Sequence, residues 1–355
     1  MLVNSIELIN FRNYSSRKFQ FNNNLNLIIG NNGQGKSNLI EAIQFLSISK
    51  SIKTNISLEL IKSGCIESSI IAEITDDDSF KNSIHIKFNN RGKQIILNNK
   101  LLIKSSDLLK TFNTVYISEE DINIVSGSPV ERRRFLDGFL TKTDFEYMDN
   151  LKQFKQIIKQ KSKLLKEEKI NRDILVLYNT KLIGINKIII KKRRKFLEYV
   201  KENIQNYLEN KFHHIKNKKV EIIYTNTLNN ENDEKEMVNK EIKYRECLYG
   251  AHRDDFSINF QEKNVKKYMS LGQKRLISFI LKLSEKDYLI KYKKINPVIL
   301  VDDAFNGLDD QTIKITEELL QDSLQKIVTT TNKNKLFSNI NSEINEIEIK
   351  ENATI

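Results

Sequence analysis

One short segment constrains the fold of this chain more than any other. Residues 30–37 read Gly30-Asn31-Asn32-Gly33-Gln34-Gly35-Lys36-Ser37. They fit the pattern G-x-x-x-x-G-K-[ST], with an apolar run at 25–29 before them and apolar residues at helical spacing after them. A phosphate-binding P-loop needs this order of strand, glycine-rich turn and helix. The segment predicts an α/β domain that binds a nucleoside triphosphate, and a chance glycine-rich turn is the alternative.

The residue types of the segment suggest a role for each part. Glycines let successive backbone N–H groups turn towards phosphate oxygens, and the helix that follows presents its positive end to them. We expect Lys36 to reach the β- and γ-phosphates of ATP, and the Ser37 hydroxyl to ligate Mg²⁺. The predicted nucleotide-binding segment runs from Gly30 to Asn38.

A second motif lies near the other end of the chain, where residues 297–303 read Pro-Val-Ile-Leu-Val-Asp-Asp. An apolar run that ends in two acids is typical of a buried parallel strand whose carboxyl end meets a ligand. We expect Asp302 to hold Mg²⁺ through water and Asp303 to orient or deprotonate the attacking water. Lys36, Asp302 and Asp303 are therefore the predicted catalytic residues.

A third motif, with Ser270, Gly272 and Gln273, opens an apolar helix about thirty residues before the acidic strand. A helix N-terminus of this kind can bind an anion. Since one fold does not easily bring two such ends to the same γ-phosphate, the pattern predicts a dimer in which each subunit completes the other's site. A simple N-capped helix without a ligand is the alternative. With residues 306–309 (Asn-Gly-Leu-Asp), the motifs follow the order of ATP-binding-cassette ATPases.

The positive charge of the chain is concentrated in one internal segment. Residues 151–220 contain 20 Lys and Arg against 6 Asp and Glu, whereas the rest of the chain holds 38 bases and 40 acids. A localised basic segment indicates a polyanion partner, with nucleic acid as the leading candidate. The run Lys191-Lys-Arg-Arg-Lys195 is also compatible with an ordinary solvated helix face.

Strand-like text flanks a long helical segment that runs from about residue 131 to residue 212. The fold class is therefore predicted as α/β: an ATPase head of mixed sheets and helices, interrupted by a mostly helical arm. We expect residues 1–138 and 244–355 to form the head and residues 139–243 to form the basic arm. No apolar run approaches membrane-spanning length, the two cysteines have no metal-ligand spacing, and no export signal is evident, so a soluble, cytoplasmic protein is expected.

Longer stretches of the sequence resemble one particular family of these ATPases. Residues 8–14 (Leu-Ile-Asn-Phe-Arg-Asn-Tyr) and 25–42 are similar to the start of RecF proteins, and residues 127–137 resemble the block before that family's helical arm. Residues 250–255 (Gly-Ala-His-Arg-Asp-Asp) resemble its Gly-Pro-His-Arg-Asp-Asp, and Thr329-Thr-Thr-Asn332 resembles its threonine run. Two positions depart from the pattern: residues 119–121 read Glu-Glu-Asp where Pro-Glu-Asp is usual, and Ala251 replaces a proline.

The resemblance implies more than the residues themselves show. It implies that Arg12 and Asn13 contribute to the nucleotide site, although the same residues also suit a polar strand end. It implies a weak, DNA-stimulated ATPase that acts as a switch on single- and double-stranded DNA at gap junctions. The implied partners are RecR and a second copy of the chain, and recombinase loading is the implied outcome. His252, Arg253 and Asp254 fit either a site or an ion-pair network.

Three other classes of protein share parts of this pattern. A chromosome-structuring ATPase of the SMC kind needs a longer coiled coil than residues 140–220 provide. A transporter ATPase is expected to carry Leu-Ser-Gly-Gly-Gln, whereas residues 269–273 read Met-Ser-Leu-Gly-Gln. A DNA-binding scaffold with vestigial hydrolysis does not need intact Lys36, Ser37 and Asp302.

Overall fold

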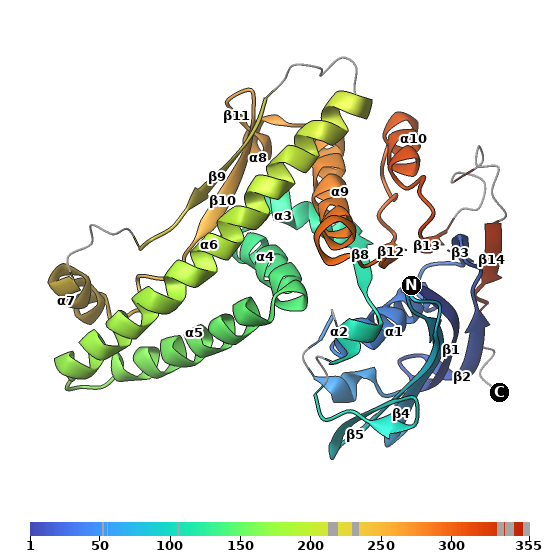
Figure 1. Cartoon of the computed structure of the whole chain (residues 1–355), viewed down its shortest axis with the longest axis horizontal. Helices are drawn as coiled ribbons and strands as arrows, with labels where there is room; N and C mark the ends of the chain where they lie inside the picture. The colour runs from blue at the N-terminus through green and yellow to red at the C-terminus, as the bar shows by residue number, and fades with distance from the viewer. Residues whose placement is uncertain are drawn as a thin grey trace. The chain divides into compact units, whose positions relative to one another are not determined.

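The computed structural model describes residues 1–51, 53–54, 56–104, 107–211, 219–228, 234–331, 337 and 344–350 (Figure 1). The chain forms two compact units. The first contains residues 1–121 and 285–355, and the second contains residues 122–284. No helix among the described residues is both long enough and apolar enough to cross a membrane.

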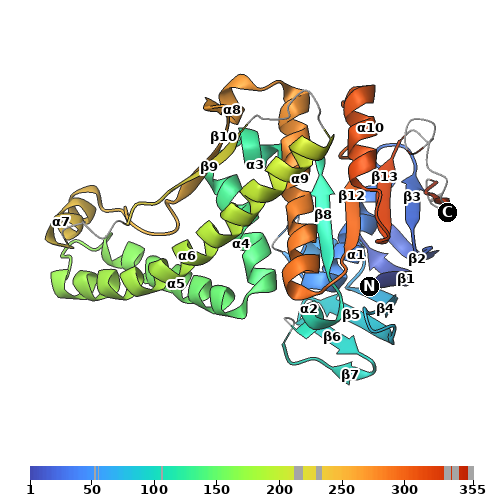
Figure 2. The same cartoon turned by 45° about the horizontal axis from the view of Figure 1, so that its top comes forward.

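A five-stranded parallel sheet joins the two ends of the chain within the first unit. Its order is β14-β3-β13-β12-β8, and every neighbouring pair is parallel. Figure 2 shows β3, β13, β12 and β8 of this sheet side by side. The strands are β3 (Leu25–Ile29), β8 (Thr114–Ser118), β12 (Val298–Asp302), β13 (Lys326–Thr330) and β14 (Ile344–Glu348). Every residue of β12 and β13 is buried, as expected for central parallel strands covered on both faces. The predicted α/β fold class is confirmed, with strands from both ends of the chain in one sheet.

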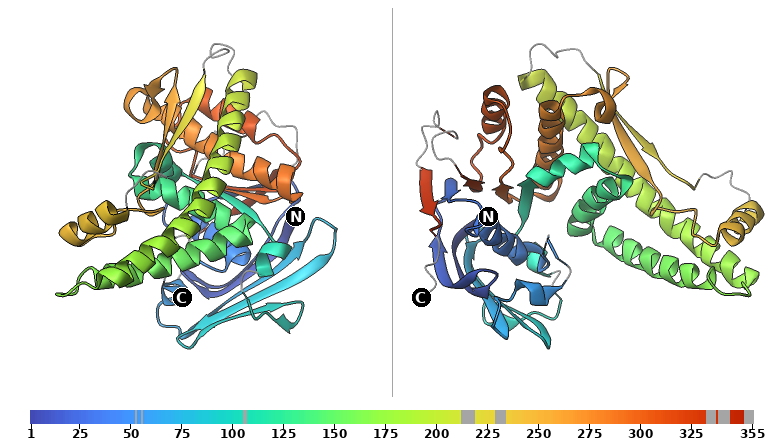
Figure 3. Two further views of the ribbon diagram at one scale, coloured as in Figure 1. Left: turned by 60° about the vertical axis from the view of Figure 1, so that its left-hand side comes forward. Right: turned by 180° about the vertical axis from the view of Figure 1, so that it is seen from behind.

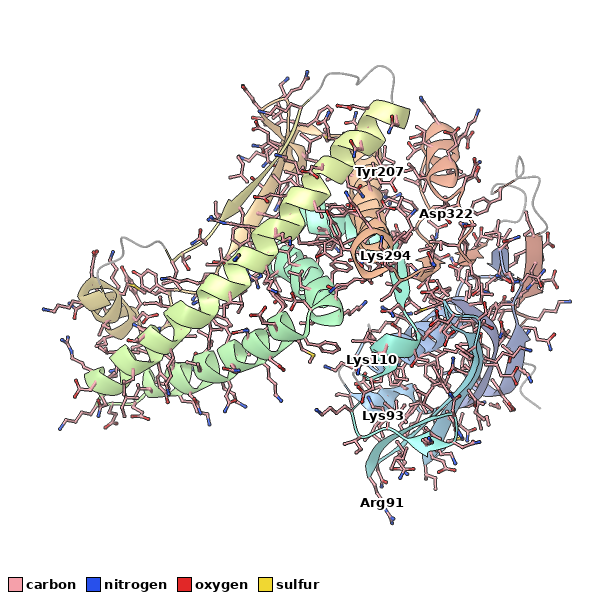
Figure 4. All side chains as sticks on the ribbon, in the orientation of Figure 1. Arg91, Lys93, Lys110, Tyr207, Lys294 and Asp322 are labelled. Atoms are coloured by element: carbon pink, nitrogen blue, oxygen red, sulfur yellow. The ribbon has the colours of Figure 1, made fainter. Side chains whose placement is uncertain are left out.

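A six-stranded antiparallel sheet forms the other layer of this unit, in the order β2-β1-β4-β5-β6-β7. Its strands are β1 (Leu2–Phe11), β2 (Tyr14–Gln20), β4 (Glu67–Thr75), β5 (Lys81–Asn89), β6 (Gly92–Leu97) and β7 (Lys100–Leu101). The turn at 89–92 joins β5 to β6, and Arg91 lies at its tip (Figure 4). Sequence reasoning missed β2, because five of its seven residues are not buried and it has no apolar alternation.

Helix α1 (Lys36–Ile48) links the two sheets into one core. Its residues from Leu39 to Ser47 are all buried, and they share a hydrophobic cluster with apolar residues of both sheets. A helix that is buried on all sides belongs to the interior, and it carries no polar face for solvent. The smaller helices of the unit are η1 (Ser57–Leu60), α2 (Leu108–Thr111), η3 (Glu119–Asp121), the π-helix η5 (Leu289–Lys293) and α10 (Asp310–Leu319).

The second unit is mostly helical (Figure 3). Its helices are α3 (Ile122–Ser126), α4 (Pro129–Thr143), α5 (Phe145–Leu164), α6 (Arg172–Lys211), α7 (Glu234–Tyr244), α8 (Val265–Tyr268) and the first part of α9 (Leu271–Tyr288). Helices α5 and α6 lie side by side, and α6 extends for about 60 Å at 1.5 Å per residue. The predicted helical segment is confirmed up to Lys211, and Phe212 lies outside the described residues.

A small antiparallel sheet completes the second unit. Its order is β11-β10-β9, from β9 (Val220–Thr225), β10 (Asp255–Phe260) and β11 (Lys263–Asn264). Phe135 and Phe139 of α4 pack on Phe196 of α6, and Phe135 also contacts Phe256 of β10. Because these contacts tie α4 and the sheet to the long helices, the compact unit is wider than the segment 139–243. The three-segment division of the chain therefore stays a prediction.

Candidate nucleotide-binding site

The glycine-rich turn lies between β3 and α1, as the motif requires. Gly33 and Gly35 have φ angles of +82° and +110°, in the left-handed region that glycine adopts without strain. Asn31, Asn32 and Gly33 are exposed, and nothing lies within 4 Å of the position that a Cβ on Gly33 would take. The outer rim of the turn is thus open, with three successive peptide groups at the surface.

Asn13 and Tyr14 support the turn from β2 and from the residues before it. The Asn13 side-chain amide donates to the Gln34 carbonyl at 3.1 Å, and the Tyr14 hydroxyl donates to the Gly35 carbonyl at 3.0 Å. A Cβ on Gly35 would lie 2.6 Å from the Asn13 amide nitrogen, so only glycine fits there. Asn38 in turn donates to the Asn13 side-chain oxygen at 2.9 Å. Asn13 therefore braces the loop, a contact that sequence reasoning did not foresee.

Lys36 is almost fully buried and lies across the loop. Its ammonium group donates to the carbonyl oxygens of Gly30 at 2.9 Å and Asn31 at 3.0 Å. The Gln34 side chain adds a contact from inside the loop, because its oxygen accepts from the Asn31 N–H at 2.7 Å. An ammonium group has three N–H bonds, and these two carbonyls use two of them.

Arg12 has a structural partner in α1. Its guanidinium group forms a two-pronged ion pair with Glu41, with both N···O distances at 3.0 Å, and it also donates to the Glu59 carbonyl. The Glu41 side chain is fully buried, whereas that of Arg12 is 20% exposed. A buried carboxylate needs such a partner, so this pair stabilises the fold beside the loop. The implied nucleotide contact of Arg12 stays a prediction.

The carboxyl ends of the parallel strands bring the predicted acids to the loop. Ser37 at the start of α1 lies near the Asp302 carboxylate, and the Tyr116 hydroxyl on β8 donates to Asp302 Oδ2 at 3.2 Å. Burial raises the pKa of the Asp302 carboxyl above its ordinary value, and the nearby Ser37 side chain opposes this rise. Burial also raises the pKa of the Tyr116 hydroxyl, and the Asp302 charge adds to that shift.

Asp303 follows the strand in a strained conformation, with φ at +52°. Thr329 at the end of β13 contacts it and its neighbour. The Thr329 hydroxyl accepts from the Asp303 N–H at 2.9 Å and lies 3.1 Å from Asp302 Oδ1 and 3.3 Å from Asp303 Oδ1. Sequence reasoning noted the threonine run but assigned Thr329 no role.

The first unit therefore assembles Lys36, Ser37, Asp302 and Asp303 at one end of the parallel sheet. A hydroxyl oxygen and a carboxylate oxygen, as in Ser37 and Asp302, are the kinds of ligand that Mg²⁺ takes from proteins alongside phosphate oxygens. These residues fit the predicted metal, and the open rim of the turn fits a phosphate chain.

The third motif lies in the second unit, outside this assembly. Ser270 precedes α9, and its backbone N–H donates to the Gln273 side chain at 3.1 Å while its hydroxyl accepts from the Gln273 N–H at 3.3 Å. This reciprocal pair is a capping box. Ser270 and Gln273 are exposed, and Gly272 is half-buried. The N-capped alternative is thus present in the structure, and the predicted nucleotide contact stays a prediction.

Asp309 is also a helix cap in the structure. Its carboxylate accepts from the backbone N–H and the hydroxyl of Thr312, at 2.8 Å and 3.0 Å, at the start of α10. The hydrogen bond from the Thr312 backbone lowers the pKa of the Asp309 carboxyl.

The basic run at 191–195 is not one solvated face. Arg193 is buried and donates to Asp137 at 2.7 Å and to the Ala251 carbonyl at 2.9 Å, and it pairs with Asp254 at 3.4 Å. Lys192 pairs with Asp144 and Glu146. Asp254 therefore belongs to an ion-pair network, which was one of the two readings of residues 252–254.

His252 lies beside that network. Its Nε2 is 3.0 Å from the Cys247 carbonyl, and its ring packs against Phe154. Burial lowers the pKa of His252 to about 4. Arg253 pairs at the surface with Glu246. Residues 252–254 therefore have structural partners.

Other basic residues of the second unit do face solvent. Four lysines of α5 are exposed at spacings of three or four residues and are referred to below as the α5 lysine stripe: Lys152, Lys155, Lys159 and Lys163. Among the described residues, no ion pair involves any of the four. The stripe extends for about 16 Å along the helix.

Known proteins match the chain along nearly its whole length. The family model of the RecF/RecN/SMC N-terminal domain matches residues 2–355. The chain is 32% identical over 348 residues to the DNA replication and repair protein RecF of Lachnospira eligens, covering 96% of this chain and 95% of that protein. It is 33% identical over 367 residues to the RecF of Thermoanaerobacter sp. (strain X514), covering 99% and 100%.

Solved structures agree with the sequence relatives. The structure of the recombination mediator protein RecF with ATP in the RecFOR pathway matches with a TM-score of 0.83 at 31% identity, over 98% of this chain and 95% of that one. The Smc head domain of Pyrococcus furiosus, at 18% identity and a TM-score of 0.59 over 99% of this chain and 94% of that one, shares the fold. The chain belongs to the RecF family of DNA replication and repair proteins, within the wider group of RecF, RecN and SMC ATPases.

Proposed function

We propose that this chain is an ATP-dependent DNA-binding protein of recombinational repair and replication-fork maintenance, in which ATP closes a dimer on gapped or junction DNA. Slow hydrolysis then releases the DNA, and recombinase loading is the outcome. The observation that carries the nucleotide part is the position of Ser37 beside Asp302 at the end of the parallel sheet. It supports a site for Mg·ATP, and the RecF structure that the chain resembles is described as one with ATP.

Each residue of the site has a proposed task. Backbone N–H groups of residues 31–36 bind phosphate oxygens, and the Lys36 ammonium contributes a donor to the terminal phosphates. Ser37 and Asp302 hold Mg²⁺, which supplies charge neutralisation when bound. Asp303 orients the attacking water. Aspartate is a shorter acid than glutamate, and we expect slow turnover for that reason.

The dimer is the second part of the proposal. Ser270, Gly272 and Gln273 open α9 at the surface, and the positive end of a helix favours an anion there. In a dimer, this end of one subunit meets the γ-phosphate bound to the P-loop of the other. The chain then needs ATP to dimerise, and hydrolysis weakens the contact.

The mass of the protein in solution, with and without Mg·ATP, tests the nucleotide-driven dimer. We expect ATP to convert wild-type monomers to dimers, Lys36→Ala to remain monomeric, and Asp303→Asn to prolong the dimer because hydrolysis is slowed. Gapped DNA is added in a second series. A wild-type protein that stays monomeric with ATP and with gapped DNA would contradict the proposal.

The α5 lysine stripe supports the proposal that the chain binds DNA. RecR is the protein partner that the family resemblance implies. Lysines bind phosphates without reading sequence, and each phosphate contact contributes about 0.9 to the log–log salt slope on duplex DNA. Replacing all four lysines of the stripe by Gln is expected to lower that slope by about 3.6 if each lysine contacts one phosphate. The matched control replaces four exposed lysines of the first unit by Gln: Lys18, Lys81, Lys87 and Lys100. A loss of binding in the control alone would place the DNA surface on the first unit.

A further inference from the structure

The two acids of the nucleotide site share one hydroxyl group. Thr329 is 1% exposed, and its Oγ1 lies 3.1 Å from Asp302 Oδ1 and 3.3 Å from Asp303 Oδ1. Its single hydroxyl hydrogen donates to one of these carboxylates at a time. The oxygen also accepts the Asp303 backbone N–H at 2.9 Å. One side chain therefore contacts both acids and the backbone between them.

The backbone contact has an energetic reason. Asp303 has φ at +52°. This conformation is unfavourable for a residue with a Cβ, and it persists only where contacts with the surrounding structure compensate for the cost. The hydrogen bond from Asp303 N–H to Thr329 is such a restraint. It fixes the direction in which the Asp303 side chain leaves the end of β12.

The same strand end also contacts the phosphate-binding loop. The Gly30 N–H donates to the Thr330 carbonyl at 3.4 Å, and β13 pairs with β3 at Thr329–Ile28 and Thr330–Ile29. The start of the loop and the two acids are thus attached to two consecutive residues of β13. We therefore expect a displacement of the loop to shift the two acids, and the reverse, through this short segment.

We propose that Thr329 is a positioning residue of the nucleotide site, whose hydroxyl sets the relative orientation of Asp302 and Asp303. The inference rests on the proposed ATPase function and deepens it. Asp302 has other hydroxyl neighbours in Ser37 and Tyr116, at the start of α1 and on β8. Thr329 adds the link to Asp303, so that the metal-holding acid and the water-orienting acid keep one geometry.

Thr329→Val tests this inference, because valine keeps the shape of threonine and removes the hydroxyl. We expect kcat to fall about 10- to 100-fold with KM for ATP changed less than about threefold, since outer contacts of a metal site act on metal affinity and turnover. The Mg²⁺ concentration that gives half-maximal binding of a fluorescent ATP analogue is expected to rise about tenfold. Thr329→Ser is expected to restore both quantities to within about threefold, because it keeps the hydroxyl.

Thr316→Val is the matched control. Thr316 is also a 1% exposed threonine of the first unit, and its hydroxyl donates to the Thr312 carbonyl within α10. The Thr316→Val protein is expected to hydrolyse ATP like the wild type. If Thr329→Val does not fold, Thr329→Cys takes its place, because a thiol is a weak donor in the same position.

Two results would overturn the inference. One is a Thr329→Val protein with wild-type kcat and wild-type Mg²⁺ dependence. The other is a Thr329→Ser protein as impaired as Thr329→Val, because the hydroxyl would then not be the cause. A wild type that neither binds nor hydrolyses ATP, like Lys36→Ala, would instead remove the proposed function and this inference with it.

Discussion

Single residues show how burial changes the meaning of a charge. Arg193 and Lys161 belong to the segment with the large basic surplus, yet their side chains are 1% and 0% exposed. Lys161 donates to Glu241 at 2.7 Å, and Arg193 contacts Asp137 and Asp254. A buried charge is retained only with such partners. These two bases therefore hold the second unit together and are not available to a polyanion.

The protonation of His252 is expected to make stability depend on pH. Burial lowers its pKa from 6.5 to about 4, so the folded protein binds the proton less readily than the unfolded chain. The contribution of neutral His252 to the free energy of unfolding is fully present above pH 6.5. It is lost as the pH falls from 6.5 towards 4. The loss in the free energy of unfolding is about 3–4 kcal/mol at most.

Urea unfolding of the wild type and of His252→Gln, at pH 7.5, 5.5 and 4.5, measures this contribution. Because carboxylates also titrate at low pH, the difference between the two proteins is the quantity of interest. We expect that difference to shrink from pH 7.5 to pH 4.5. Parallel pH profiles for both proteins would show that His252 is not the responsible group.

At the scale of elements, the start of α9 illustrates how a motif can have two roles. Ser270 and Gln273 cap the helix reciprocally, which satisfies backbone N–H groups that otherwise have no partner. The same positions are those predicted to meet the γ-phosphate of a partner subunit. Capping and phosphate binding use the same helix end, and they differ in the charge that they tolerate.

Substitutions at Ser270 separate the two roles. Ser270→Asp keeps a good N-cap but places a negative charge at the helix end, so thermal stability is expected to stay within about 0.5 kcal/mol of wild type. ATP-dependent dimerisation is expected to disappear, because the carboxylate repels phosphate. Ser270→Ala is expected to cost about 1 kcal/mol in urea unfolding.

The mass of Ser270→Asp in solution with Mg·ATP measures its dimerisation. Normal dimerisation would mean that Ser270 caps the helix and does not contact the γ-phosphate. The Ser270→Ala protein serves as the comparison for stability. If it unfolds at the same urea concentration as the wild type, the capping box contributes nothing measurable.

At the scale of the whole molecule, the first unit is built from distant parts of the chain. Strands β3 and β8 precede the second unit in sequence, whereas β12, β13 and β14 follow it. All five belong to one parallel sheet, in which the early strand β3 lies between β14 and β13 and the early strand β8 pairs with β12. Neither half of the chain contains the complete parallel sheet, so the two halves depend on each other for that sheet.

A protease site inserted between Asn229 and Asn230 tests this dependence. After cleavage, we expect the two fragments to elute together from a sizing column, because the sheet holds them through backbone hydrogen bonds and a shared core. They are expected to separate only in denaturant. Separation under native conditions would mean that the sheet does not join the two flanks stably.

Much of the fold and part of the site follow from local sequence. The apolar run at 25–29 and the glycine positions predict the strand, turn and helix of the loop, because left-handed backbone at Gly33 and Gly35 is a local requirement. The alternation in β4 and β5 and the long helices of the second unit are also local patterns. The strand β2 was missed, since it has a nearly polar sequence and is fixed by pairing with β1.

The sequence by itself determined the loop, the acidic strand and the order of motifs, because each depends on residues that are neighbours in the chain. Only the tertiary structure decided which side chains meet. Thr329 contacts both acids because β13 lies beside β12, and Asn13 braces Gly35 because the residues before β2 pass over the loop. Arg12 pairs with Glu41 because the residues between β1 and β2 lie beside α1. Contacts between distant segments depend on packing and strand order, which no local pattern specifies.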